Sequence, residues 1–566
     1  MKKILYVASA TCVILLSACG GGGDVNIKPT TVDNSTDNST TNPPAASPTE
    51  SPCAAYQNSG GQTIEGVYDG QDCIYAPTFV DAGNNLAVDM TIPALPNSGA
   101  HVFQGSLFVG ESYDTDADLA AAGISEGGDG PVLTIEAGAT LAFTSNSNFL
   151  IINRGSQIFA VGTEDAPITV THVDDTESER AAGTTFPFDE VQKWGGMVIN
   201  GFGVTNKCVY TGSVAGGDLA TSDCHVDAEG AAGLDESQYG GDNNDDSSGR
   251  LEYFVVKHTG AEVANGDELN GISFGGVGRN TIIKNLEVYS TYDDGVELFG
   301  GAVNITNFVA LYVRDDSIDI DEGYSGTISN ALVIQSATDG NHCIEADGIG
   351  SFSSLAPDVI ESIISQGINS SPTISNLTCI ISPNPIETAT HDPGAGWRLR
   401  EGIMPTISDS MVIAIGADDQ GSTSDNYCLR IDNRSAQAAE DGDLVINSSL
   451  FACAQADRGS LPGGATVKAF AEAGGNQFAT VATTGTDPTT LADTGLVVLQ
   501  AGSSSTAPVY SVAFTSMVVD GNAPTVSPAP TSGRLGGLDN TIPDWTQNWT
   551  YGIHEGSRGA DLWFEQ

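Results

Sequence analysis

A repeat of 22 and 23 residues runs through residues 281–350 and restricts the folds that this chain can adopt. Asn285, Asn307 and Asn330 each open a short apolar run, with the sequences NLEV, NFVA and NALV. Each run leads through an acidic turn into a second strand-like segment: DDGVEL at 293–298, DDSIDI at 315–320 and DGNHCIEA at 339–346. Repeats of this length, with β-branched runs between Gly, Asp and Asn corners, are typical of stacked coils.

Two stacked-coil architectures have a repeat near this length. A leucine-rich repeat requires regularly spaced leucines and a helical segment in every copy, and residues 281–350 show neither. Each copy instead contains two or three apolar alternations separated by turn residues, which predicts short strands that pair with the coils above and below at about 4.8 Å. We therefore predict an all-β chain that forms a right-handed parallel β-helix of three sheets, with a cap region at each end.

Alternation along the second strand predicts which side chains leave the coil. If Val296 and Leu298 face the core, Glu297 faces outward, and Asp319 does so one repeat later. Two such carboxylates, stacked about 4.8 Å apart, repel each other by about 3.5 kcal/mol at an effective dielectric constant near 20. Calcium is the natural counter-ion for clustered carboxylates, whereas solvated acidic corners that merely suit turn geometry are the alternative. The predicted calcium ligands are Asp294, Glu297, Asp316, Asp319, Asp321 and Glu345.

The N-terminus has the features of an export signal. Lys2 and Lys3 precede a short apolar run that ends in LSAC at 16–19, which is too short for a membrane span. This ending resembles the lipobox of bacterial lipoproteins. The resemblance implies cleavage after residue 18 and a lipid on the Cys19 sulfur, and Gly20 favours the outer membrane. Several acyl chains would hold the protein there stably. The expected location is therefore the outer membrane, lipid-anchored and surface-exposed, with an ordinary secretory signal as the alternative.

Composition divides the rest of the chain. Residues 19–52 contain few apolar side chains among Gly, Ser, Thr, Asn and Pro, which predicts a flexible tether. Residues 53–130 are predicted to form the N-terminal cap and the first strands, 131–460 the β-helix, and 461–566 the last rungs and the C-terminal cap. In that last segment Trp545 and Trp549 either pack into the cap or form a platform for a ligand.

Cysteine spacing agrees with an exported protein. Of the ten cysteines, Cys12 leaves with the signal peptide and Cys19 carries lipid. The others show no CxxC spacing, which argues against zinc and thioredoxin-like sites. Disulfides between neighbours in the sequence are predicted instead: Cys53 with Cys73, Cys208 with Cys224, Cys343 with Cys379, and Cys428 with Cys453.

The net charge of −52 excludes a class of partners. Nucleic acids and anionic membrane surfaces repel so acidic a body. A polysaccharide, a surface protein or metal ions remain as possible partners.

Several longer motifs resemble a known group of proteins. They are YGGDNNDDSSGRLEYFVV at 239–256, ELNG at 268–271, GVG at 276–278, DDGVELFGG at 293–301 and DDSIDIDEGYSG at 315–326. Together they resemble a family of bacterial secreted or surface lipoproteins with a parallel β-helix, over residues 131–415. The resemblance implies the fold, export and surface display, and it supplies no reaction.

Two catalytic hypotheses can be compared with the residues. A pectate-lyase-like enzyme would use the acids at 294, 297, 316, 319 and 345 to hold calcium and Arg398, Arg400 or Arg430 as base, although no lyase motif is present. A polygalacturonase-like hydrolase would use the Asp pairs at 293–294 and 315–316, but its Gly-His-Gly and Arg-Ile-Lys elements are missing. His342 adjoins Cys343, but the predicted disulfide removes that thiol, which argues against a catalytic cysteine–histidine pair. Binding or display is therefore the favoured function, and a calcium-dependent lyase for uronate polymers is the alternative.

Overall fold

The computed structural model describes residues 51–566, apart from 81–82, 182–184, 212–223, 230–236, 265–266, 385–386, 389–390, 415–424, 480–513, 515–518, 520–521, 540, 559–560 and 566. The predicted signal peptide, the predicted lipidation site Cys19 and nearly all of the predicted tether lie outside the described residues. Within the described ranges, no helix is both long enough and apolar enough to cross a membrane.

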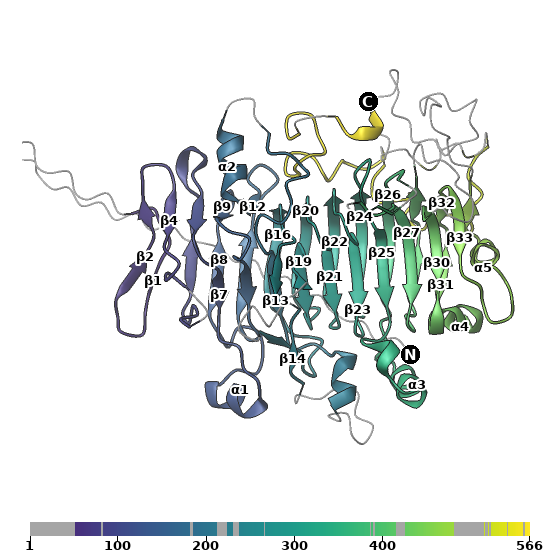
Figure 1. Ribbon diagram of the computed structural model, residues 1–566, viewed down its shortest axis with the longest axis horizontal. Helices are drawn as coiled ribbons and strands as arrows, with labels where there is room; N and C mark the ends of the chain where they lie inside the picture. The colour runs from purple at the N-terminus through teal and green to yellow at the C-terminus, as the bar shows by residue number, and fades with distance from the viewer. Residues whose placement is uncertain are drawn as a thin grey trace, which may run out of the picture. The chain divides into compact units, whose positions relative to one another are not determined.

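The chain coils into a parallel β-helix with three sheets, as predicted, and the strands of successive rungs lie side by side (Figure 1). The first sheet has ten strands. In order along the coil they are β7 (Leu107–Val109), β10 (Leu150–Ile152), β13 (Met197–Asn200), β19 (Ile272–Gly275), β21 (Val296–Phe299), β23 (Ile318–Asp321), β25 (His342–Asp347), β27 (Ala395–Arg400), β30 (Tyr427–Ile431) and β33 (Gln455–Arg458).

The second and third sheets share five long strands, each of which turns a corner: β16 (Gly249–Lys257), β20 (Ile282–Tyr289), β22 (Asn304–Leu311), β24 (Thr327–Ile334) and β26 (Thr373–Ile380). The second sheet adds β5 (Met90–Ile92), β8 (Val132–Ile135), β11 (Gln157–Val161), β28 (Thr406–Ser408) and β31 (Val445–Asn447). The third adds β4 (Cys73–Tyr75), β6 (His101–Phe103), β9 (Thr140–Phe143), β12 (Ile168–His172), β29 (Met411–Ile413), β32 (Leu450–Ala452) and β34 (Gln477–Phe478).

The repeated asparagines form the corner inside four of these long strands, and Tyr253 has the positive φ angle (49°) in β16. Asn285, Asn307, Asn330 and Asn376 all have positive φ angles, between 53° and 60°, a conformation that Asn tolerates better than most residues. The Asn307 side chain donates a hydrogen bond to Asn285 Oδ1 (2.7 Å), and Asn330 donates to Asn307 (3.2 Å). The residues that set the sequence period therefore set the corner as well.

Strand register confirms the predicted repeat and its alternation. Ile282 pairs with Asn304, 22 residues away, and Val296 pairs with Ile318 at the same spacing. Val296, Leu298, Ile318 and Ile320 are fully buried in the core, whereas Glu297 and Asp319 leave the outer face. The apolar interior of the coil therefore holds every rung in one register.

The two ends of the coil combine paired strands with covering segments. Parallel pairing begins at β4 and β6, well before residue 131, and only β1 (Ala55–Gln57), β2 (Thr63–Glu65) and β3 (Val67–Tyr68) form antiparallel pairs at that end. At the other end α5 (Val467–Ala473) packs on the last strands. The described C-terminal residues lie along the third sheet instead: Tyr551 N donates to Glu287, and Trp549 is 2% exposed against Tyr253.

The remaining elements lie in the connections between rungs. They include the hairpins of β14 (Val226–Asp227) with β15 (Gln238–Tyr239) and of β17 (Glu262–Ala264) with β18 (Asp267–Glu268), and the helices α1 (Asp116–Ala122), α2 (Val173–Arg180), α3 (Pro357–Gln366) and α4 (Asn433–Asp441). All four predicted disulfides form: Cys53–Cys73, Cys208–Cys224, Cys343–Cys379 and Cys428–Cys453.

Candidate functional site

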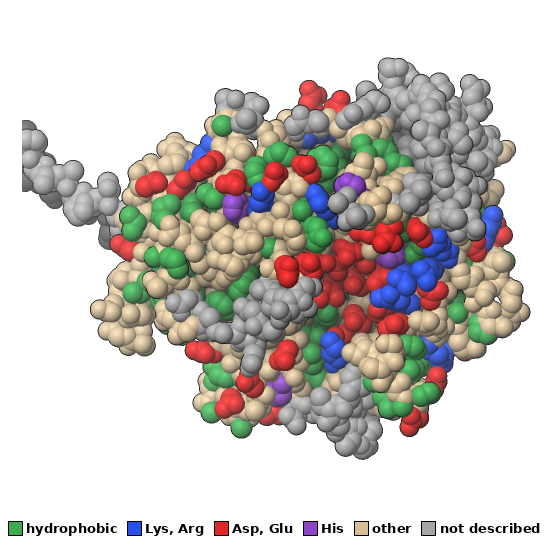
Figure 2. Space-filling model, viewed as in Figure 1, with side chains coloured by type: hydrophobic (Ala, Val, Ile, Leu, Met, Phe, Trp, Pro, Cys, Tyr) green, Lys and Arg blue, Asp and Glu red, His purple; other side chains and the backbone are tan. Residues whose placement is uncertain are grey.

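The outer face of the first sheet carries a column of charged side chains in register. From β21 to β33 the column reads Glu297, Asp319, Glu345, Arg398, Arg430 and Arg458. Figure 2 shows the result, a dense patch of acids that adjoins a patch of arginines near the centre of this face. The sign changes between β25 and β27, so acids and arginines meet across one pair of strands.

A second row of polar side chains lies in the turns just before these strands. Asp294 Oδ1 accepts a hydrogen bond from Asp316 N (2.9 Å), and Asp316 Oδ1 accepts one from His342 N (2.7 Å). One rung earlier, Asn270 Oδ1 accepts from Asp294 N (3.2 Å). Each side chain thus caps the next rung, which fixes it at the edge of the charged column.

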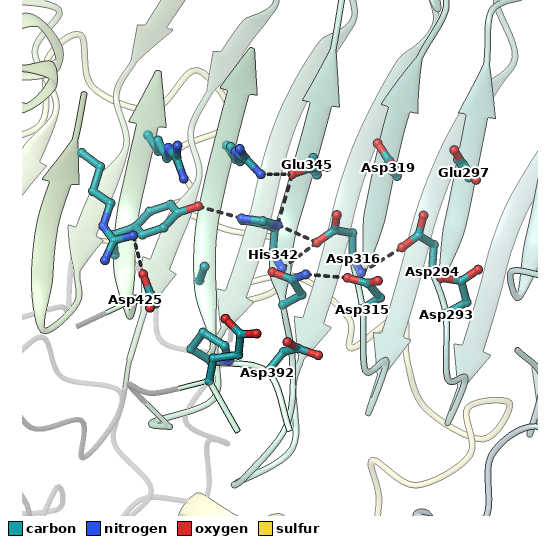
Figure 3. Close-up of a pocket in the computed structure, with 18 of the residues that line it drawn as sticks. Asp293, Asp294, Glu297, Asp315, Asp316, Asp319, His342, Glu345, Asp392 and Asp425 are labelled. Atoms are coloured by element: carbon teal, nitrogen blue, oxygen red, sulfur yellow. Dashed lines mark hydrogen bonds and ion pairs between the residues drawn. The ribbon is translucent and has the colours of Figure 1, made fainter. Parts of the chain in front are cut away.

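The column and the turns line one cavity of about 460 Å³ (Figure 3). The acid half of the cavity consists of Asp293, Asp294, Glu297, Asp315, Asp316 and Asp319, and the arginine half consists of Arg398, Arg430 and Arg458. The other lining residues are Glu229, Asn341, His342, Glu345, Glu387, Asp392, Pro393, Ala395, Asp425 and Tyr427. Acids outnumber cations, so the cavity itself is strongly negative.

Oxygen atoms in the acid half lie close enough together to hold a cation. Asp293, Asp294 and Asp315 form one group, Asp294, Glu297 and Asp319 form another, and the ligand atoms of each group lie within 4.8 Å of one another. Such sets of carboxylates suit Ca²⁺, a hard cation that takes oxygen ligands. The donor set therefore fits calcium.

Burial and mutual repulsion change the protonation of these acids. Burial, followed by the nearby charges of Glu229 and Asp315, raises the pKa of Asp293 from 3.8 to about 8. Burial, followed by the charges of neighbouring carboxylates, also raises the pKa of Asp294, Glu297 and Asp319 well above the usual values. A bound cation would replace the protons that these groups hold without one.

His342 and Tyr427 connect the acid half with the arginine half. His342 Nδ1 lies 2.8 Å from Asp316 Oδ1, and Nε2 lies 2.7 Å from the Tyr427 hydroxyl. Burial lowers the pKa of His342 to about 4, and burial raises the pKa of Tyr427. A neutral imidazole that donates from Nδ1 to the carboxylate must accept the Tyr427 proton at Nε2.

The arginines of the cavity are held by carboxylates. Arg398 Nη1 lies 2.8 Å from Glu345, and its Nε lies 3.6 Å from Asp432. Arg430 Nε lies 2.5 Å from the same Asp432 oxygen. The Arg458 guanidinium forms an ion pair with Asp425 and lies over the Tyr427 ring, 5.0 Å from its centre. These contacts orient three guanidinium groups along one side of the cavity.

Two residues predicted from the sequence lie outside the cavity. Asp321 leaves β23 on the outer face, but its carboxylate accepts the Glu322 N–H (2.6 Å) and does not line the cavity. Arg400 binds Glu345 (2.6 Å) and Asp347 (2.5 Å), and these carboxylates raise its pKa, so it is a poor candidate for a base. The other five predicted metal ligands, Asp294, Glu297, Asp316, Asp319 and Glu345, all line the cavity, as do Arg398 and Arg430.

Some cavity residues were not predicted as part of the site. His342, considered from the sequence only as a partner of Cys343, stands three residues before Glu345, as Asp316 stands before Asp319 and Asp294 before Glu297. That shared spacing could have placed His342 in the row of Asp294 and Asp316. Glu229, Glu387, Asp392 and Asp425 come from irregular connections, where no period indicates their position.

Fold and site together define a parallel β-helix with a charged cavity on the outer face of one sheet. A family model described as a pectate-lyase-like β-helix domain matches residues 114–490. The chain belongs to this family of pectate-lyase-like β-helix domains. No curated protein and no solved structure gives a significant match. A β-helix of this family is compatible with carbohydrate binding and with polysaccharide lyase activity.

Proposed function

We propose that this chain binds uronate-containing polysaccharide at the charged cavity, with the help of calcium held in the acid half. The observation that carries the proposal is the meeting of clustered carboxylates and aligned arginines in one cavity of about 460 Å³. Carboxylates alone would repel an acidic polymer, and arginines alone would not explain the clustered acids. A polyanion together with calcium satisfies both halves.

The two halves of the cavity would bind different partners. Asp294, Glu297 and Asp319, with Asp293 and Asp315 beside them, would hold calcium. Bound calcium would neutralise these acids and bridge them to the carboxylates of the sugar chain. In the other half, guanidinium groups bind carboxylates through two parallel hydrogen bonds, which gives both strength and orientation.

Cleavage by β-elimination is the second candidate function, and the hydrogen-bonded His342–Tyr427 pair in the cavity favours it. In this reaction a base removes the proton at C5 of the uronate, the electrons form a C4–C5 double bond, and the C4–O bond breaks. The departing oxygen then takes a proton. Arg398, Arg400 and Arg430 were the candidate bases of the lyase hypothesis, but their carboxylate partners favour the charged form. Burial raises the pKa of Tyr427, so its hydroxyl keeps its proton and is the group that would give the second proton to the departing oxygen.

The proposed location follows from the predicted lipobox. The lipid on Cys19 would anchor the chain in the outer membrane, and residues 19–52 would hold the β-helix at the cell surface. Cells fed a labelled fatty acid should label the wild-type chain and not a Cys19→Ala variant. Equal labelling of both chains would contradict lipid attachment at Cys19.

Binding is tested on residues 51–566 with polygalacturonate and alginate, by calorimetry in calcium and in chelator. The proposal expects binding in calcium, a loss of at least tenfold in affinity for Asp319→Asn, and little change for the matched control Asp321→Asn on the same strand. Absorbance from unsaturated uronate ends, followed in the same samples, separates cleavage from binding. Equal affinity in calcium and in chelator, or no affinity for either polymer, would contradict the proposed calcium-dependent binding.

A further inference from the structure

The outer face of the first sheet is covered at one end of the charged column. Before Glu297, the residues at the same register position are Phe108, Ile151, Val198 and Ser273. Their exposed fractions are 5%, 0%, 1% and 2%. The outer face of β7, β10, β13 and β19 therefore has no room for a ligand.

Side chains from two connections close the acid end of the cavity. Asn270 Nδ2 donates to Ser273 Oγ (3.0 Å), to Glu229 Oε2 (3.0 Å) and to Glu297 Oε2 (2.6 Å). The Tyr239 ring lies directly on Gly275, where an added Cβ would come within 2.7 Å of it. Glu229, Tyr239 and Asn270 thus form a wall across the column immediately before its first acid, Glu297.

This wall is tied to the body of the coil. The buried Arg154 side chain donates to the carbonyl oxygens of Cys224 (3.1 Å) and Gly240 (2.8 Å). The Tyr239 hydroxyl donates to Glu322 Oε2 (2.5 Å). Because these contacts are buried and bridge distant parts of the sequence, the wall is a fixed part of the fold.

The arginine end of the column is exposed. The side chains of Arg398, Arg430 and Arg458 are 23%, 30% and 23% exposed, and Asp425 beside them is 39% exposed. Arg458 lies on β33, the last strand of the sheet, so the column reaches the end of the coil. A chain that lies along the column can therefore leave over the arginines, whereas the wall stops it at the acids.

We propose that the cavity binds the end of an acidic polysaccharide chain rather than its middle. The terminal uronate lies over the acid half against Glu229, which the buried Asn270 holds in place, and the following residues lie along Arg398, Arg430 and Arg458. This inference rests on the proposed binding function and adds the part of the polymer that is recognised.

The number of protein molecules on each polymer chain tests the inference. Polygalacturonate fractions of increasing length are mixed with excess residues 51–566 in calcium, and the mass of the complex is measured by light scattering. End binding predicts one protein per chain at every length. A number that grows in proportion to length would overturn end binding and leave calcium-dependent binding intact. Absence of any complex would overturn both.

Capping the polymer identifies the bound end. A bulky fluorophore at the reducing end or a modified sugar at the non-reducing end should abolish binding in one case and leave it unchanged in the other. Full affinity for both capped polymers would contradict end binding. If the chain also cleaves the polymer, end binding predicts short products with a slow fall in viscosity, and a rapid fall in viscosity would contradict it.

Discussion

The acid half and the arginine half of the cavity share one backbone and differ in how their charges are compensated. Below both halves the inward side chains are apolar and buried, from Leu298 and Ile320 to Leu399. Above the arginine half, each guanidinium has a carboxylate partner, such as Asp425 for Arg458. The arginine half is therefore complete in the protein alone.

Three acids of the acid half differ in this respect. Within the residues that the structure describes, no Lys or Arg forms an ion pair with Asp294, Glu297 or Asp319. The pKa of each of the three is raised, because the charged forms are buried near one another. Rungs with the same backbone can therefore carry charges that are balanced within the protein, or charges that need a cation from solution. The two halves should respond differently to calcium, to pH and to mutation.

Calcium should have the largest effect, and it should act through the acid half. At a calcium concentration about 100 times its dissociation constant, binding to the folded state alone adds about 2.7 kcal/mol to the free energy of unfolding. Asp319→Asn should lose most of that gain, since it removes a member of the group with Asp294 and Glu297. Thermal unfolding with calcium and with chelator measures the difference.

Asp321→Asn is the control for this effect. Asp321 lies on the same strand and also leaves the outer face, but it does not line the cavity. An equal loss of calcium stabilisation in both variants would show that general negative charge, and not the acid half, responds to calcium.

The second effect is a dependence of stability on pH without calcium. The pKa of Asp293 is raised to about 8 in the folded chain, whereas it is near 3.9 when the chain unfolds. Between these values the folded state holds a proton that the unfolded state has released, so stability falls as the pH rises. The Asp293 proton alone should make the free energy of unfolding about 2 kcal/mol lower at pH 8 than at pH 6, as measured by urea unfolding in chelator. Asp293→Asn should reduce the pH dependence by that amount, and the raised pKa values of Asp294, Glu297 and Asp319 should keep the remainder. A wild-type chain that is more stable at pH 8 would contradict this prediction.

The features of the acid half that follow from the 22- and 23-residue repeat could be predicted from the sequence. Alternation around Glu297 and Asp319, and the asparagine period, were enough to predict the three sheets and the outward acids, because apolar burial fixes strand register. The arginines of the same column were visible as alternating strands, but their register with the acids was not. Between Glu345 and Arg398 the chain leaves the coil for the connection that contains α3, so no period joins the two halves.

The wall and the cavity could not be predicted either, and the reason is different. Glu229, Asp392 and Asp425 reach the cavity from irregular connections, and their positions depend on contacts between residues far apart in the sequence. The buried Arg154, which holds the wall through backbone carbonyl oxygens, has no sequence pattern that distinguishes it from a surface arginine. Asp321 was predicted as a ligand because alternation cannot tell which outward acid faces a cavity.

The third effect should appear in the arginine half and should not depend on calcium. Arg398→Ala would leave Glu345, 12% exposed, with Arg400 as its remaining arginine partner among the described residues. For a partly buried pair we expect a loss of about 1–2 kcal/mol in the free energy of unfolding, between the values for exposed and buried ion pairs. Urea unfolding should show this loss equally in calcium and in chelator. A loss confined to calcium would mean that Arg398 belongs functionally to the acid half.

The smallest effect should come from the bond that joins the halves. Tyr427→Phe removes the hydroxyl that lies 2.7 Å from His342 Nε2 and leaves the ring under Arg458. A net loss of about 1 kcal/mol in the free energy of unfolding is expected for one buried hydrogen bond, with calcium stabilisation unchanged. Calorimetry and the assay for unsaturated uronate ends then separate two roles for the hydroxyl. Affinity that is kept while any cleavage is lost would identify Tyr427 as a group that acts on the reacting atoms. Cleavage at the wild-type rate would assign the bond to structure alone, since the phenyl ring has no proton to donate.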